Sequence, residues 1–431
     1  QNRVQQFESA WYLKINKPYI GLNRMAYSIF TTMTSSRFQA FASKLSIISL
    51  LIFALSFPLS VKIMVYCTWI LSISAIISYI AFREFKLNLI YIFPLFFYVI
   101  RLASFIITDT DTKFLENGLS FILIPLAFCV IKINGQQLQF LLKNILWGYL
   151  AICVIILTIY ATKIIIPGHF LEAIIRPKSF HAYFLVNPIH GHPSFLISIL
   201  AFIIPLSFYL NYTLKKINSY IMILGIVLVI TCTYISGARI GVVINLCLLI
   251  LSMIFYRKEL NTKIKIAGLT CGVAIVILVV FNASKFSSDP IRSELFRVGI
   301  ETIKKNPWKG SGIESMRKYI HNAEFNVAEK YGRDSYLQNH FHNQLIDEIV
   351  QFGIPAGVIF ILFWMCCLKT AIQRKDYLLY CFIAIYIVFI NVDSSMGAAK
   401  GLVPILFWLC LIFSTQNIRL QPYKSYLKNH E

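Results

Sequence analysis

Long apolar runs alternate with short polar connections along most of this 431-residue chain. About twelve runs reach the roughly twenty residues that an α-helix needs to cross a bilayer. They cover residues 44–60, 63–82, 88–108, 115–131, 138–161, 193–211, 218–235, 239–256, 264–281, 343–368, 377–394 and 397–414. The pattern predicts an all-α, polytopic membrane protein with about twelve transmembrane helices. The composition agrees, because 58% of the residues are hydrophobic and only 14% are charged, whereas soluble domains carry about a quarter charged residues.

A polar stretch of about sixty residues interrupts this pattern between the ninth and tenth predicted helices. It spans residues 282–342 and concentrates cationic and histidine side chains: Arg292, Arg297, Lys304, Lys305, Arg317, Arg333, His340 and His342. We expect a large, partly helical loop at one bilayer surface. A membrane protein rarely keeps so much basic surface in one place without an anionic ligand, so this loop is the first place to look for function.

Cations in the short connections give the orientation, because Lys and Arg favour the cytoplasmic side. Most fall on the side that carries both termini; examples are Arg83, Lys132, Arg257, Lys258, Arg374 and Lys424. The first apolar run starts only after Lys44, so we expect no cleavable signal peptide. The predicted order is a cytoplasmic segment 1–43, nine helices in 44–281 with an outer loop at 162–192, the outer loop 282–342, three helices in 343–414 and a cytoplasmic tail 415–431.

Several classes of chemistry are disfavoured. The ten cysteines lie inside apolar runs without a C-x-x-C pair, which argues against a disulfide framework or a thiolate metal site. The net charge of +21 fits topology and anionic lipid, and we expect no nucleic acid because the chain lacks a basic soluble domain. Asp109 and Asp111 form a D-x-D pair, but their expected position is outside the cell, where nucleotide sugars are absent, so we interpret them as a polar turn.

Two histidines precede the tenth predicted helix. His340 and His342 are two residues apart, but two histidines without further ligands are too few to indicate a metal site, so we expect no metal. The amino end of a helix disfavours a protonated imidazole, and a neutral histidine there is available as a general base. A capping or packing histidine is the alternative interpretation.

Three arginines are candidate anion ligands. Arg297 lies in a segment, 296–308, that predicts a helix ending before Pro307, followed by a turn at 310–312; a solvated helix face is the alternative for Arg297. Arg239 lies at the edge of an apolar run, where a guanidinium is costly unless it pairs with an anion or snorkels to the interface. Arg176 lies in the smaller outer loop. Buried charges, namely Arg101, Asp393 and Lys400, mark either a translocation path or pairing between helices.

Three motifs in this order resemble the O-antigen ligase and Wzy-type polymerase superfamily of bacterial inner membranes. They are S-G-A-R at 236–239, the segment 297–312 with N-P-W-K-G-S-G, and H-N-Q-L-I-D-E-I-V-Q-F-G at 342–353. The number of helices and the large outer loop between the ninth and tenth also match. The resemblance covers most of the chain from about residue 44.

The resemblance implies roles for particular residues. His342 is implied as the functional histidine, Arg239 and Arg297 as ligands of a lipid diphosphate, and Arg176 as a weaker match for the same role. We expect His340, Asn343 and Glu348 to support the site. Members of this superfamily move glycan from undecaprenyl diphosphate to an acceptor hydroxyl without nucleotide and are regarded as metal-independent, so no cofactor is expected.

The implied function is inverting glycan transfer at the periplasmic face of the inner membrane, in lipopolysaccharide biosynthesis. The expected partners are an undecaprenyl-diphosphate-linked glycan donor, a lipid A–core or other glycan acceptor, and membrane lipid. An O-antigen ligase is favoured over a Wzy-type polymerase of O-antigen or capsule and over a protein O-oligosaccharyltransferase. A transporter or flippase of lipid-linked sugar is the rival from another class.

Overall fold

The computed structural model describes residues 36–108, 118–162, 193–236, 239–260, 290–331, 341–390, 399–415 and 418–419. Within these ranges the regular structure is helical and contains no strand, which confirms the all-α prediction. Several predicted features lie largely outside the described residues: the ninth span, the smaller outer loop after its first residue, most of both terminal segments and parts of the loop 282–342.

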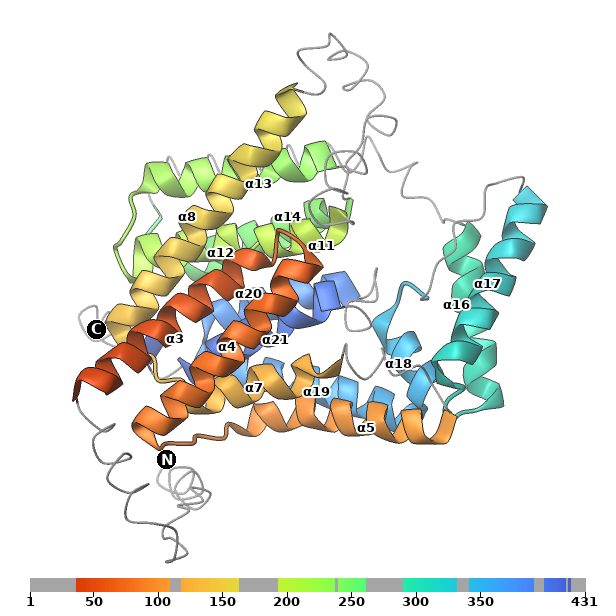
Figure 1. Ribbon diagram of the computed structural model, residues 1–431. Coiled ribbons are helices and arrows are strands. Elements are labelled where there is room, and N and C mark those ends of the chain that lie inside the picture. Colours follow the sequence, from red (N-terminus) through yellow and green to blue (C-terminus); the bar gives the residue numbers. More distant parts are fainter. Residues whose placement is uncertain are drawn as a thin grey trace, which may run out of the picture.

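Several consecutive helices are joined by short connections, such as the one between α3 and α4 and the one between α19 and α20 (Figure 1). Their bounds are α3 Ser36–Ser56, α4 Val61–Phe82, η1 Leu89–Tyr91, α5 Ile92–Thr108, α7 Ser120–Val130, α8 Gly135–Tyr160, α11 Pro193–Leu200, α12 Ile203–Phe208, η3 Tyr209–Thr213, α13 Ser219–Ser236, α14 Arg239–Phe255, α16 Pro290–Lys305, α17 Gly312–Tyr331, α18 Gln344–Phe352, α19 Ile354–Arg374, α20 Tyr377–Ile390 and α21 Ala399–Ser414.

Seven helical segments among the described residues are long and apolar enough to cross a bilayer. They are Ser36–Ser56, Val61–Phe82, Leu89–Ile106, Gly135–Tyr160, Phe195–Thr213, Ser219–Ser236 and Ile354–Arg374. Four shorter apolar helices accompany them, in α7, α14, α20 and α21. Each predicted span that the structure describes therefore coincides with apolar helix, except for the first part of the tenth, and the protein is a multi-pass membrane protein.

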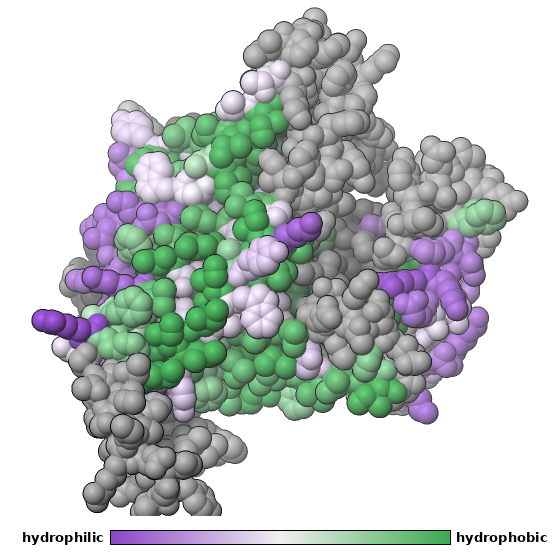
Figure 2. Space-filling view, viewed as in Figure 1, coloured by the Kyte–Doolittle hydropathy of each residue, from purple (hydrophilic) through white to green (hydrophobic). Residues whose placement is uncertain are grey.

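The centre of the helix bundle is formed by the segment Phe195–Thr213 together with α20 and α21. This segment is 89% buried over its most apolar window, far more than the other candidate spans. The Phe202 and Trp408 rings stack inside it, with centroids 4.2 Å apart. By contrast α3, α4, α5 and α8 carry a broad hydrophobic surface (Figure 2). Such a surface matches lipid acyl chains rather than water.

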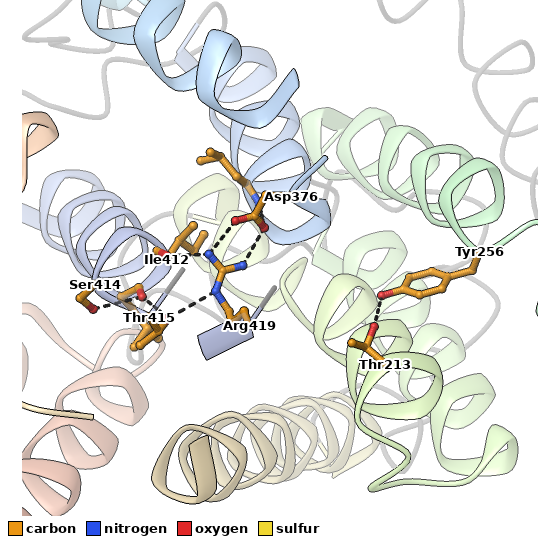
Figure 3. Close-up of polar contacts among 9 residues, drawn as sticks. Thr213, Tyr256, Asp376, Ile412, Ser414, Thr415 and Arg419 are labelled. Carbon is orange, nitrogen blue, oxygen red and sulfur yellow. Dashed lines mark hydrogen bonds and ion pairs between the residues drawn. The ribbon is translucent and has the colours of Figure 1, made fainter. Parts of the chain in front are cut away.

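A buried ion pair closes one end of the bundle (Figure 3). The Arg419 guanidinium donates to both carboxylate oxygens of Asp376, at 2.6 and 2.8 Å, and to the carbonyl oxygen of Ile412 at 2.6 Å. Both charged side chains are almost fully buried. The pair joins the chain after α21 to the connection between α19 and α20. It therefore lies at the carboxyl end of α19.

A helical hairpin, formed by α16 and α17, lies at the opposite end of α19. Its inner faces bury a small core of their own with α18: Leu295, Met316, Ile320, Ala323, Phe341, Ile346 and Val350. Its outer surface is strongly hydrophilic (Figure 2). The predicted helix at 296–308 is confirmed but begins earlier, at Pro290, and ends at Lys305. The predicted turn is also confirmed, with Gly310 and Gly312 at positive φ.

The predicted tenth span, 343–368, differs from the structure. It is divided at Gly353 into a short helix, α18, and a membrane-spanning helix, α19. The apolar positions continue through both helices, which is why the sequence pattern did not separate them. The polar residues of α18 are buried against other elements instead of facing water: Gln344, Asp347, Glu348 and Gln351. The first helix also begins at Ser36 rather than at residue 44.

Candidate active site

His342 immediately precedes the cap of α18, and the backbone is held on both sides of it. The Asn343 side chain accepts a hydrogen bond from the amide of Ile346 at 3.1 Å, as an N-cap residue does. The amide of Phe341 donates to the Asp347 carboxylate at 2.9 Å. His342 itself adopts φ 57°, a left-handed conformation that is uncommon outside glycine. Strained conformations of this kind concentrate at functional sites.

The electrostatic setting of His342 follows from its position at the start of α18. The amino end of a helix carries partial positive charge, which opposes protonation of a neighbouring imidazole. The side chain is half-buried. A neutral, partly accessible imidazole is the form that accepts a proton from a hydroxyl group.

The far end of α18 is locked to the turn of the hairpin by backbone contacts. The Ser311 amide donates to the Val350 carbonyl oxygen, and the Ile354 amide donates to the Pro307 carbonyl oxygen, both at 2.7 Å. Gly353 has φ 85°, and a Cβ atom there would lie only 2.1 Å from the Trp308 carbonyl oxygen. The N-P-W-K-G-S-G turn and the end of the motif at 342–353 therefore form one structural unit.

Substituting Gly353 tests this contact. The Gly353→Ala variant is expected to lose about 2 kcal/mol of folding free energy, because both the positive φ and the backbone contact exclude a side chain. The thermal unfolding midpoint in detergent measures the loss. Gly135→Ala is the matched control, since the nearest atom to its Cβ is 3.5 Å away on a side chain. Equal midpoints for the two variants would contradict the predicted contact.

A buried ion pair joins α18 to the membrane helix α5. An Arg101 guanidinium nitrogen lies 3.8 Å from Glu348 Oε1, and the two side chains are 2% and 3% exposed. Gln344 donates to the same carboxylate oxygen at 2.7 Å. The Arg101 guanidinium also lies over the rings of Phe121 and Phe352, at 4.9 and 5.8 Å from their centroids. Of the two interpretations of Arg101, the structure supports pairing between helices.

Burial dominates the ionisation of Glu348. Its pKa is raised above the ordinary value of 4.5 because loss of hydration disfavours the carboxylate more than Arg101 and the Gln344 hydrogen bond favour it. A raised folded-state pKa favours the folded state while the group is protonated in both states, below pH 4.5. That contribution is lost as the pH rises through the folded-state pKa.

A pH series on Glu348→Gln tests this prediction. The variant amide does not titrate, so the wild-type protein should lose stability relative to it as the pH rises from about 4 through the raised pKa of Glu348. Above that range the difference should become constant. Unfolding midpoints of both proteins across the series measure the effect. A difference that does not change with pH, or that changes in the opposite direction, would show that burial does not control this group.

Arg297 lies on the exposed face of α16. Its guanidinium donates to Glu294 and Glu301, with Nη–Oε distances of 2.5 Å, and its side chain is 57% exposed. The hydrogen bonds that Arg297 donates to Glu294, and then the negative charge of Glu294, raise the Arg297 pKa. Gly299 lies on the face that meets α18, since a Cβ there would be 2.7 Å from Ile346. Side chains two positions apart on an α-helix point about 200° away from each other around the helix axis. Arg297, two residues before Gly299, therefore points away from α18. This placement matches the solvated-face alternative, and its role near a diphosphate stays a prediction.

The other predicted ligands are less fully described. Arg239 begins α14, but its side chain lies outside the described residues, as do Arg176 and His340. Six residues after Arg239 in α14, the Asn245 side-chain amide donates to the Thr233 hydroxyl at 2.8 Å and thereby joins α14 to α13. The predicted D-x-D pair and the charges of Asp393 and Lys400 also lie outside the described side chains. No three His, Cys, Asp or Glu side chains are grouped for a metal ion among the described residues.

Arg101 is the site residue that the sequence motifs did not point to. A lone arginine inside an apolar run and two carboxylates before another apolar run, Asp347 and Glu348, were the available signals. Their pairing joins segments far apart in the chain, so only the packing of α5 against α18 identifies the partner.

The fold and site define a class: a multi-pass, all-α membrane protein in which a hydrophilic helical hairpin packs against a short helix, with a histidine just before that short helix. Residues 196–361 match the family described as O-antigen ligase, which confirms the resemblance to this superfamily. The matched segment runs from α11 into α19 and contains Arg239, Arg297 and His342. None of the curated proteins matches the chain.

Proposed function

We propose that this protein is an O-antigen ligase that transfers glycan from undecaprenyl diphosphate to a lipid A–core hydroxyl. The family match indicates O-antigen ligase or polymerase-type activity in a membrane protein. The observation that carries the proposal is the position of His342, half-buried and fixed at the amino end of α18 beside the hairpin. No nucleotide is needed, because the lipid diphosphate donor already carries the activated bond.

In the proposed reaction, His342 accepts the proton of the acceptor hydroxyl while its oxygen attacks the anomeric carbon. The bond from that carbon to the diphosphate oxygen breaks, its electron pair leaves with the diphosphate, and the anomeric configuration inverts. Asn343, His340 and Glu348 support the site. Asn343 does so by capping α18, and Glu348 by fixing α18 to α5 through Arg101.

Guanidinium groups offset the charge that develops on the departing diphosphate, as preorganised cations do near a leaving group. We assign this role to Arg239 and Arg176. Arg297 joins them only if the donor displaces Glu294 and Glu301, its present partners. A diphosphate is a good leaving group, so the chemistry does not require a metal ion.

The orientation of α19 supports a periplasmic site. Its carboxyl end carries Lys369, Arg374 and Lys375, and cations near membrane helices favour the cytoplasm. The other end of α19 adjoins α18 and the hairpin. The charge pattern of α19 therefore supports a position of His342 at the periplasmic face of the bacterial inner membrane, where the carrier lipid presents its glycan.

A reconstituted transfer assay tests the proposed activity. Purified protein in detergent, given undecaprenyl-diphosphate-linked glycan and lipid A–core, should form the ligated product, and a metal chelator should leave the rate unchanged. A transporter or flippase would form no product in the same mixture. Offering a second glycan repeat or a protein acceptor in parallel reactions separates the polymerase and the oligosaccharyltransferase from the ligase.

Glycan analysis of a deletion strain gives an independent distinction. Loss of a ligase leaves full-length polymer on the carrier lipid and an unmodified lipid A–core. Loss of a polymerase instead leaves single repeats attached to the core. If the deletion strain carried single repeats on its core, the protein would be a polymerase of O-antigen or capsule and not a ligase.

A further inference from the structure

The turn of the hairpin displays three lysines and a tryptophan to the outside. We name this group the turn patch: Lys304, Lys305, Trp308 and Lys309. All four side chains are exposed, and Trp308 is 70% exposed. The sequence from 304 to 309, K-K-N-P-W-K, contains no carboxylate. The exposed Trp308 side chain therefore neither packs in the hairpin core nor caps a helix, and the lysines around it have no carboxylate in the same stretch.

The charge balance of the turn differs from that of the rest of the hairpin. Elsewhere on its outer surface, Arg297 pairs with Glu294 and Glu301, and Arg317 pairs with Glu314. Within the described part of the chain, the three patch lysines form no such ion pair. Arg297 and Arg317 of the hairpin are thus paired with carboxylates, whereas the turn gathers three cations and no carboxylate.

Backbone contacts fix the turn patch relative to the membrane helices. Pro307, next to Trp308, accepts the hydrogen bond from Ile354, the first residue of the membrane span α19. Ile313, just after the turn, packs on Phe352 together with Ile100 of the membrane helix α5. In Figure 1 the turn end of the hairpin accordingly lies beside the end of α5. The patch is thus held beside the start of α19 and close to α5, two helices that are long and apolar enough to cross a bilayer.

We propose that the turn patch binds the headgroups of anionic phospholipids in the leaflet next to the hairpin. Tryptophan favours the headgroup region, where its ring is amphipathic, and lysine stems reach along the interface while their ammonium groups contact phosphate. The three cations are spread over exposed positions at one end of the hairpin instead of converging in a pocket, which favours a lipid surface over a single bound donor diphosphate. The contact anchors the hairpin, and with it α18, to the bilayer.

Lipid quenching of Trp308 fluorescence tests the position of the patch. The whole protein is placed in nanodiscs of phosphatidylcholine and phosphatidylglycerol, with and without bromine near the carbonyl end of the acyl chains. The emission of wild type minus that of Trp308→Phe isolates this residue among the six tryptophans. Bromine should quench the difference signal. An unquenched signal would place the turn away from the bilayer and overturn the proposal.

Lipid selectivity tests the partner. Phosphatidylglycerol retained on the detergent-purified protein is measured by mass spectrometry for wild type, for the triple variant Lys304→Ser, Lys305→Ser and Lys309→Ser, and for the control Lys318→Ser, an exposed lysine of α17. Binding should fall about fivefold per patch lysine and stay unchanged in the control. Equal retention by all three proteins would refute the proposal. Unchanged retention together with weaker binding of undecaprenyl diphosphate would assign the patch to the donor instead. None of these readouts requires transfer activity, so they stand apart from the proposed function.

Discussion

Replacing His342 with alanine is expected to abolish glycan transfer while leaving the protein folded. Removing a general base typically slows a reaction by about 10²–10⁴-fold. The neighbouring residues keep their contacts in the variant, because Asn343 caps α18 and Phe341 donates to Asp347 through its backbone. The reconstituted transfer rate, at equal protein concentration, measures the effect.

The conformation of His342 calls for a second variant. Alanine at φ 57° adds some backbone strain, whereas asparagine adopts this left-handed region readily. His342→Asn therefore keeps the backbone and removes the imidazole, and it should lose activity as completely as His342→Ala. Unfolding midpoints close to the wild-type value confirm that both variants are folded. Normal glycan attachment by either folded variant would remove His342 from the mechanism.

Breaking the buried ion pair should have the second large effect. Arg101→Met leaves the Glu348 carboxylate buried without its cation, at an expected cost of about 3 kcal/mol. This value is at the lower end for buried pairs, because Glu348 can take up a proton. The unfolding midpoint should fall, and transfer should fall with it, since Glu348 lies on the helix that His342 precedes.

Two further variants separate pairing from general loss of packing. Lys132 pairs with Glu84 at 2.7 Å on the surface, and Lys132→Met should cost less than about 1 kcal/mol because water screens exposed pairs. The double variant Arg101→Met with Glu348→Leu should regain much of the stability lost by Arg101→Met alone, since no unpaired charge remains. If the double variant lost as much unfolding free energy as the two single variants lose together, Arg101 and Glu348 would not be energetically coupled.

The membrane helices were predictable because hydrophobic length is a local property. The apolar run of α8, for example, indicates a helix by its own composition, and in the structure Asn134 caps the start of that helix. The division at Gly353 was not predictable in this way. Leu345, Ile346 and Ile349 continue the apolar pattern into α19, and the polar residues between them are stable there only because α5 and the hairpin cover them.

The candidate site was predictable to the extent that it lies within one motif. The order of residues 342 to 348 predicted His342 directly before a helix, and the structure adds that Asn343 is the N-cap of that helix. The ion pair of Glu348 depends on a residue in a distant membrane helix, Arg101, and no local spacing contains that information. For Arg297, the glutamates three and four residues away were visible in the sequence, and their i,i+3 and i,i+4 spacing is that of the ion pairs in the structure.

The most direct test of the account is an experimental structure of the protein with undecaprenyl diphosphate bound. We predict that the diphosphate lies at the end of the bundle that carries α18 and the hairpin, with the His342 imidazole facing the position of the anomeric carbon and the Arg239 guanidinium on the phosphates. Binding of the diphosphate at the opposite end of α19, near Arg419 and Asp376, or out of reach of His342, would contradict it.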